Sequence, residues 1–217
     1  MIYALIPAAG ISSRMGRPKL ALPLGDRTVL GHVVRALQQA GIEQILVVVG
    51  PQASELVPLA QAAGAAVLLL PKQTNEMRAT VEQGLSWLEA QFHPSEKDSW
   101  LLVPADHPTL NPAVIGQLLK AREQNPQFSI AVPTFEGRRG HPALLSWKHV
   151  AGIQRFSAHQ GLNVYLRHHT EETLELPVDS SDILRDLDTP EDYEQLRADL
   201  ALMRVDHTGR IMPEVDS

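Results

Sequence analysis

Residues 6–20 read IPAAGISSRMGRPKL and carry more information about this chain than any other segment. They follow an apolar run, residues 2–6, that is typical of a buried first strand. Small residues around Gly10 allow backbone N–H groups to converge on an anion, and Arg14 and Lys19 add positive charge. The segment therefore predicts a phosphate-binding loop at the end of the first strand.

Two common phosphate-binding motifs do not fit this loop. A Walker A motif requires Ser or Thr after Gly-Lys, whereas Lys19 stands between Pro18 and Leu20. The spacing of Gly10 and Gly16 does not match the dinucleotide-binding pattern G-x-G-x-x-G. The alternative is a glycine-containing turn with incidental basic residues, and the complete string favours phosphate binding over that alternative.

Apolar runs alternate with segments of helical period along the first part of the chain. We expect strands at residues 2–6, 45–49, 66–70, 100–103 and 128–132. We expect helices at residues 29–40, 53–63, 76–88 and 112–122, with Thr28 and Asn111 as N-caps. Continuous apolar strands suit burial on both faces, so this alternation predicts an α/β fold, a three-layer α/β/α arrangement with a mostly parallel sheet. Ligands of such sheets gather at the carboxyl ends of the strands, where residues 8–19 and 105–110 lie.

The second half of the chain is less regular. Residues 137–142 predict a loop, 143–145 a strand, 146–156 and 161–169 helices, 174–178 a late strand and 190–202 a final helix. We expect one domain over residues 1–202 and a poorly ordered tail over residues 203–217.

Composition excludes several classes of protein. The chain has 217 residues, which suffice for one α/β domain, and its net charge of −6 argues against a general nucleic-acid binder. Because the chain has no cysteine, disulfides, thiolate catalysis and cysteine metal sites are impossible. Neither a signal-peptide pattern nor a run of roughly 18 apolar residues is present, so we expect a cytoplasmic protein without a membrane partner.

Two acidic segments are candidates for metal binding. Asp106 follows the apolar run 100–103, where a carboxylate can hold Mg²⁺ that also contacts nucleotide phosphates; the alternative is a helix cap. Residues 185–193 read RDLDTPEDY, and Thr189 and the residues after it are explained by the start of a helix. That explanation does not cover Asp186 and Asp188, which precede the helix.

The three segments, in this order, resemble the signatures of the MobA-like NTP transferase family, whose fold is Rossmann-like GT-A. Within this family, the motifs most resemble those of the molybdenum-cofactor cytidylyltransferase branch. The family's first loop reads A-(A/G)-G-x-S-x-R-M-G-x-x-K and is matched by Ala8, Ala9, Gly10, Ser12, Arg14, Met15, Gly16 and Lys19. The resemblance implies that these residues bind the nucleotide and that Arg14 and Lys19 contact its phosphates.

The resemblance also assigns the metal and the acceptor. It implies that Mg²⁺ is bound by Asp106, which stands in the family's Asp-x-Pro element, and by the acids of the element D-x-D-T-P-E-D, with Asp188 as the first choice and Asp186 as the second. It also implies that the catalytic residues are Lys19, Arg14, Asp106 and Asp188. The R-G-H-P loop of the family corresponds to Arg139, Gly140, His141 and Pro142 and implies acceptor binding. We expect His107, His168 and His169 at the surface.

The helix start at residues 76–82, EMRATVE, departs from the family's G-M-S-x-S-L-R. Met77 and the Ser-like Thr80 match it and are implied to bind the nucleotide. Arg78 and Glu82 change size and charge where family members approach the nucleotide. Ala9, where guanylyl-transferring relatives carry Gly, favours a pyrimidine nucleotide.

The expected reaction is transfer of a nucleoside monophosphate, with CTP favoured as donor, to a phosphorylated small-molecule acceptor such as molybdopterin, with release of pyrophosphate. A phosphomonoester with a second pKa of about 6 is largely dianionic at neutral pH, so no general base is needed. Two alternatives stay open: a nucleotidyltransferase for a sugar phosphate or alcohol phosphate, and a non-catalytic nucleotide-binding module.

Overall fold

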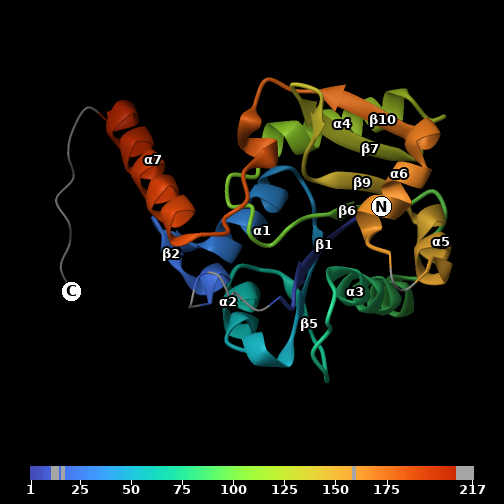
Figure 1. Ribbon diagram of the computed structural model, residues 1–217, viewed down its shortest axis with the longest axis horizontal. Coiled ribbons are helices and arrows are strands. Elements are labelled where there is room, and N and C mark those ends of the chain that lie inside the picture. The colour runs from blue at the N-terminus through green and yellow to red at the C-terminus, as the bar shows by residue number, and fades with distance from the viewer. Residues whose placement is uncertain (11–14, 16–17, 158–159, 209–217) are drawn as a thin grey trace.

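The computed structural model describes residues 1–10, 15, 18–157 and 160–208, and within them eight strands form the main sheet (Figure 1). These strands are β1 (Ile2–Ala8), β4 (Gln44–Val49), β5 (Ala66–Leu69), β6 (Ser99–Leu102), β7 (Ile130–Phe135), β8 (Arg138–Arg139), β9 (Ala143–Ser146) and β10 (Thr173–Pro177). Their order is β10-β7-β9-β6-β1-β4-β5, and β8 pairs with β7.

Most neighbouring strands of the sheet are parallel, as the alternating pattern predicts. Strand β1 runs parallel to β4 and β6, β4 to β5, and β7 to β10. Strand β9 is antiparallel to both of its neighbours, β6 and β7. The carboxyl ends of β1 and β6 therefore lie side by side at one edge of the sheet, which is where ligands of such sheets bind.

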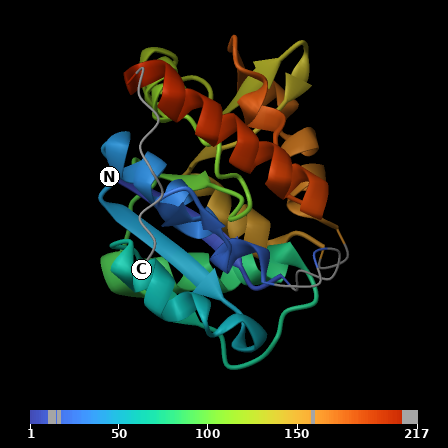
Figure 2. The same ribbon diagram turned by 90° about the vertical axis from the view of Figure 1, so that its left-hand side faces the viewer.

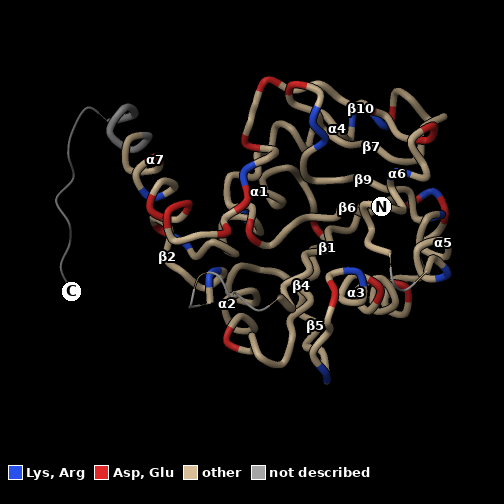
Figure 3. The backbone as a smooth tube through the Cα atoms, viewed as in Figure 1, with Lys and Arg blue, Asp and Glu red and all other residues tan. Residues whose placement is uncertain are grey.

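Helices cover both faces of the sheet and confirm the three-layer arrangement. They are α1 (Val29–Gln39), α2 (Leu56–Ala62), α3 (Met77–Phe92), α4 (Pro112–Gln124), α5 (Val150–Arg155), α6 (Leu162–His168) and α7 (Pro190–Thr208). Alternate residues of β1 point into two separate cores: Ile6 packs with α1, α2 and α4, and Leu5 packs with α3, α5 and α6. The strands β1, β4 and β6 carry no charged residue (Figure 3).

The N-cap residues that the sequence predicts are present at the starts of α1 and α4. The Thr28 side chain accepts a hydrogen bond from the Gly31 N–H at 3.0 Å and caps α1. The Asn111 side chain accepts from the Ala113 N–H at 2.8 Å, and Pro112 occupies the first turn of α4.

One predicted burial pattern and several predicted element boundaries are wrong. Strand β5 is not buried on both faces, because it ends the strand order, and its Leu69 is 48% exposed. The predicted helix 53–63 is shorter in the structure, because Ala53 ends a 3₁₀ turn, Pro51–Ala53, and α2 spans only Leu56–Ala62. Within the predicted loop 137–142, Arg138–Arg139 pair with β7 as β8. The predicted helix 146–156 begins with the end of β9 and a 3₁₀ turn, Trp147–His149, before α5.

A small hairpin, β2 (Pro23–Leu24) with β3 (Arg27–Thr28), was not predicted. Gly25 lies in its turn at φ 68°, a conformation that favours glycine. Helix α7 lies on the outside of the helical layer that contains α1 (Figures 1 and 2). Its Tyr193 hydroxyl donates to the Pro23 carbonyl. The helix extends beyond Leu202 to Thr208, and residues 209–217 lie outside the described part of the chain.

None of the helices in the described part of the chain combines the length and the apolar character that a membrane span requires.

Gly84 allows α3 to approach the sheet closely. A Cβ atom there would collide with the Leu5 side chain and lie 2.8 Å from Val48 Cγ2, whereas a Cβ at Gly116 of α4 would meet nothing within 4 Å. We expect Gly84→Ala to lower the free energy of unfolding by about 1–2 kcal/mol, because overpacking outweighs the gain in helix propensity. Gly116→Ala is the control and should be neutral or stabilising by up to about 1 kcal/mol. Urea unfolding measures both, and equal stability of the two variants would contradict the close approach.

His149 predicts a pH dependence of stability. It is buried, its Nε2 lies 2.7 Å from Ser129 Oγ and its Nδ1 lies 3.0 Å from the Tyr165 hydroxyl. Burial is the main cause that lowers the pKa of His149 from 6.5 to about 4. Because the folded pKa lies below the unfolded one, His149 stabilises the fold above pH 6.5, and this contribution is lost as the pH falls toward about 4.

Between about pH 7 and about pH 5, His149 should therefore contribute a loss of about 2 kcal/mol of unfolding free energy. Urea unfolding at several pH values should show a smaller loss for His149→Gln than for the wild type. The same pH dependence in both proteins would contradict this assignment.

Candidate active site

A cavity of about 600 Å³ opens where β1 and β6 end. Four segments that are distant in sequence line it: residues 7–10 with Met15, Lys19 and Leu20, residues 73–77 with Thr80, residues 104–106, and Asp188. Parallel strands bring the loops that follow them to the same edge of the sheet, so the topology itself assembles the cavity.

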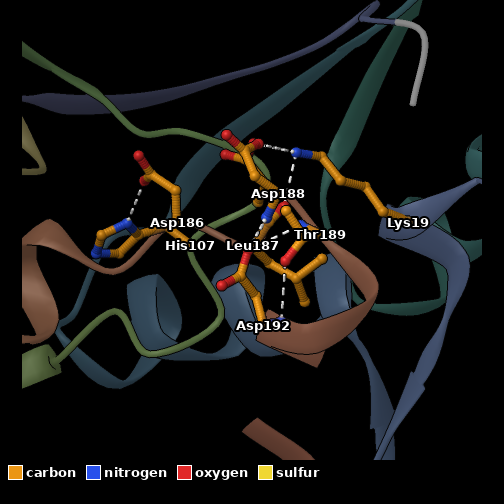
Figure 4. A network of polar contacts seen from close by, with 8 residues as sticks. Lys19, His107, Asp186, Leu187, Asp188, Thr189 and Asp192 are labelled. Carbon is orange, nitrogen blue, oxygen red and sulfur yellow. Dashed lines mark hydrogen bonds and ion pairs between the residues drawn. The ribbon is translucent and has the colours of Figure 1, made fainter. Parts of the chain in front are cut away.

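Lys19 connects three of the segments around this cavity. Its ammonium group donates to Asp106 Oδ2 at 2.6 Å, to the Leu187 carbonyl at 2.7 Å and to Asp188 Oδ1 at 2.9 Å (Figure 4). The Lys19 side chain is 15% exposed, and those of Asp106 and Asp188 are 26% and 45% exposed. The sequence prediction that these three residues share one site agrees with this geometry.

Burial is the largest influence on the pKa of Lys19 and acts to lower it. The hydrogen bonds and charges of Asp106 and Asp188 together outweigh burial, so the pKa of Lys19 lies above its ordinary value. Lys19 is therefore charged at neutral pH and presents a cation between two carboxylates.

Backbone contacts fix the segment that carries Asp188. The Leu187 N–H donates to the Asp106 carbonyl at 2.9 Å, which joins this segment to the loop after β6. The Asp192 carboxylate accepts from the Asp188 and Thr189 N–H groups at 3.0 and 2.7 Å, and Thr189 Oγ1 accepts from the Asp192 N–H at 3.2 Å. This reciprocal capping at the start of α7 confirms the predicted N-cap and holds Asp188 at the cavity.

His107 is not at the surface, and the prediction that it would be is wrong. Its side chain is 1% exposed, and its Nδ1 lies 3.1 Å from Asp186 Oδ1 (Figure 4). The hydrogen bond to His107 is the main cause that lowers the pKa of Asp186. Asp186 therefore faces His107, and it is Asp188 that shares a cation with Asp106.

Of the other histidines expected at the surface, His168 is exposed and His169 is half-buried, with its ring stacked on Tyr165 at 4.2 Å between centroids. Neither lines the cavity.

The residues matched to the acceptor loop do not line the cavity and contact residues of neighbouring segments instead. Arg139 pairs with Glu175 at 2.8 Å, and Gly140 packs directly against the Ile183 carbonyl. The ring of His141 lies 6.0 Å from that of His107, and the backbone N–H of His141 donates to the Ile183 carbonyl at 2.9 Å. Burial lowers the pKa of His141, with His107 acting in the same direction, so the imidazole is neutral at pH 7. The cavity lining does not include residues 139–142, and their acceptor role stays a prediction.

Met77 and Thr80 line the cavity, and they are the residues of this helix start that the family resemblance assigns to nucleotide binding. Thr80 is buried, and its hydroxyl lies 2.6 Å from that of Thr74. Gln73 Nε2 donates to the Ala9 carbonyl and so ties the first loop to the segment before α3. Sequence reasoning missed Gln73 and Thr74, because polar residues in a loop carry no motif of their own.

Arg78 and Glu82 do not line the cavity, although they replace family residues close to the nucleotide. Arg78 is buried and donates to the carbonyls of Ile153 and Phe156 at the end of α5, and it pairs with Glu82 at 2.8 Å. Its charge is used to join α3 to α5.

The remaining residues of the first motif divide into two groups. Ala8, Ala9, Gly10 and Met15 line the cavity together with Lys19. Ser12, Arg14 and Gly16 lie outside the described residues, and their roles stay predictions.

The donor set at the cavity suits one hard divalent cation. No group of three or more His, Asp or Glu side chains in the described residues is arranged as a complete metal site. Asp106 and Asp188 nevertheless converge on one cationic group within 2.9 Å. Mg²⁺ is commonly bound by one or two carboxylates and completes its coordination with water and phosphate oxygens. The arrangement therefore fits a cation that arrives with a phosphorylated ligand.

Comparison with known proteins agrees with this geometry. The profile of the MobA-like NTP transferase domain matches residues 4–173. A 2-C-methyl-D-erythritol 4-phosphate cytidylyltransferase of Shewanella amazonensis is 36% identical over 135 residues, which are 59% of this chain and 53% of the relative. The chain thus matches about half the length of this curated relative.

Solved structures match over almost the whole chain. The crystal structure of Rv0371c from Mycobacterium tuberculosis H37Rv is 26% identical, covers 91% of this chain and 97% of its own, and superposes with a TM-score of 0.73. A second structure of that protein, a complex with manganese, has the same identity and coverage and a TM-score of 0.69.

The contact between buried His107 and half-exposed Asp186 should contribute to stability. We expect His107→Leu to lower the free energy of unfolding by about 0.5–1.5 kcal/mol, because Asp186 loses its hydrogen-bond partner and water replaces it only in part. His107→Asn offers Asp186 an amide donor and is expected to lose less. Urea unfolding compares the two variants, and a Leu variant as stable as the wild type would show that the contact is energetically neutral.

Proposed function

The chain belongs to the MobA-like NTP transferase family, and from this premise we propose that it is a Mg²⁺-dependent nucleotidyltransferase that uses CTP. It would transfer CMP to a small molecule that carries a phosphate monoester and release pyrophosphate. The observation that carries this proposal is the convergence of Lys19, Asp106 and Asp188 on one cavity at the carboxyl edge of the sheet.

One observation favours CTP as the donor: the Shewanella amazonensis relative is named a cytidylyltransferase. The family resemblance points the same way, because it places Ala9 where guanylyl-transferring members carry Gly. The acceptor is less constrained. Molybdopterin follows from the resemblance of the motifs, and an alcohol phosphate is the substrate that the name of the relative contains. Both are phosphate monoesters, so the same site chemistry serves either.

In the proposed reaction, an oxygen of the acceptor phosphate forms a bond to the α-phosphorus of CTP as the bond from that phosphorus to the bridging oxygen breaks. The electron pair of the broken bond leaves with pyrophosphate. The acceptor phosphate is largely dianionic at pH 7 and requires no side-chain base. The protein's contribution is then to position the phosphates and to stabilise their charge.

Each side chain has a part in this positioning. Lys19, charged at neutral pH, would contact phosphate oxygens from its place in the cavity wall. The loop around Gly10 is held by Gln73, which lies in the segment before α3, and it would place backbone N–H groups near the nucleotide. Mg²⁺ bound by Asp106 and Asp188 would neutralise phosphate charge, and the manganese complex of Rv0371c supports a divalent cation.

Pyrophosphate release tests the proposal. We expect release with CTP above that with ATP, GTP or UTP when a panel of molybdopterin, alcohol phosphates and sugar phosphates is supplied, and no release after Mg²⁺ is chelated. Asp106→Asn should reduce the rate on the order of 10³-fold, by analogy with the loss of a charge-stabilising group in other phosphoryl transfers, because one of the two carboxylates loses its charge.

Asp179→Asn is the matched control, since it removes the same charge at an exposed position outside the cavity. It should retain the wild-type rate. Nucleotide binding without pyrophosphate release for any acceptor in the panel, or an unchanged rate in Asp106→Asn, would refute the proposed activity.

A further inference from the structure

The ammonium group of Lys19 lies in a cradle of three oxygens. Asp106 Oδ2, the Leu187 carbonyl and Asp188 Oδ1 surround Lys19 Nζ at 2.6, 2.7 and 2.9 Å. Both carboxylates also line the cavity. A divalent cation that used Asp106 and Asp188 would therefore need the same oxygens that now hold the ammonium group.

Binding of two cations to these oxygens at the same time is opposed by the electrostatic repulsion between the cations. At separations of a few ångström their repulsion is strong wherever water screens poorly, and the Lys19 side chain is only 15% exposed. Conversely, without Lys19 the two carboxylates would repel each other across the cradle. One cation, either the ammonium group or the metal, satisfies both requirements.

We propose that Lys19 holds the divalent-cation position while the nucleotide site is empty and gives it up when nucleotide phosphates enter. This inference rests on the proposed function, because it requires a phosphorylated ligand that draws the lysine away. A divalent cation then binds weakly to the protein alone and strongly together with the nucleotide. By linkage, each of these two ligands raises the affinity of the protein for the other.

The cradle is built to persist when the lysine leaves. The Leu187 N–H is bonded to the Asp106 carbonyl at 2.9 Å, and the backbone at Asp188 is held by the Asp192 carboxylate at 3.0 Å. These contacts do not involve Lys19. The lysine itself lies at the start of a short 3₁₀ turn, Lys19–Ala21, and its four-carbon side chain allows the ammonium group to move without the backbone.

The first test measures Mn²⁺ binding without nucleotide, from the loss of the free-ion electron paramagnetic resonance signal. Lys19→Met should bind Mn²⁺ about tenfold more tightly than the wild type, because its carboxylates have lost their competing cation. Lys72→Met removes an exposed lysine near the cavity and should stay within about twofold of the wild type.

An affinity of Lys19→Met equal to or below that of the wild type would overturn the proposal. So would an equal gain in Lys72→Met, which would show a general effect of charge. Thermal melting confirms folding, and Lys19→Gln replaces the Met variant if the latter does not fold.

The second test is a wild-type crystal soaked with Mn²⁺ and CTP. We expect anomalous density for Mn²⁺ between Asp106 and Asp188, with Lys19 Nζ moved from both carboxylates to the phosphates. A lysine that keeps both carboxylate bonds beside the bound Mn²⁺ would overturn the proposal. Absence of CTP binding would count against the proposed function instead, while the nucleotide-free Mn²⁺ measurement still decides the role of Lys19.

Discussion

The contacts of the half-buried Lys19 ammonium group link three of the segments that form the site. Lys19 comes from the loop after the first strand, Asp106 from the loop after β6, and Leu187 and Asp188 from the segment before α7. Because two carboxylates and a carbonyl accept hydrogen bonds from the same side chain, Lys19 offsets part of the carboxylate charge and adds to the backbone contact between Leu187 and Asp106 that already joins two of these segments. The segment before α7 is thereby joined to the loop after β1.

The sheet supplies the rigid base for these contacts. Strands β1 and β6 are adjacent and parallel, and they carry buried apolar residues toward both faces. Their loops emerge together at one edge, so side chains that are 87 residues apart in the chain meet there. The reciprocal capping by Thr189 and Asp192 then fixes the direction from which Asp188 enters.

Charged residues near the site serve two different purposes. Asp106 and Asp188 face the cavity with Lys19 and are available to a phosphorylated ligand and its cation. Asp186 turns to buried His107, and Arg78 turns to the end of α5. These two side chains stabilise the walls. A motif therefore does not show by itself which of its charged members contact the ligand.

The sequence by itself determined the α/β class, the mostly parallel sheet and the caps at Thr28 and Asn111, which follow from apolar runs and capping residues. Its resemblance to the family's motifs pointed to Lys19, Asp106 and Asp188 but did not separate Asp188 from Asp186. Only the tertiary structure decided that β5 lies at an edge, that β9 runs antiparallel, that His107 is buried against Asp186, and that Gln73 holds the first loop. The physical reason is that burial and hydrogen-bond partners depend on segments far away in the chain, and a local pattern contains no information about which distant segment will pack against it.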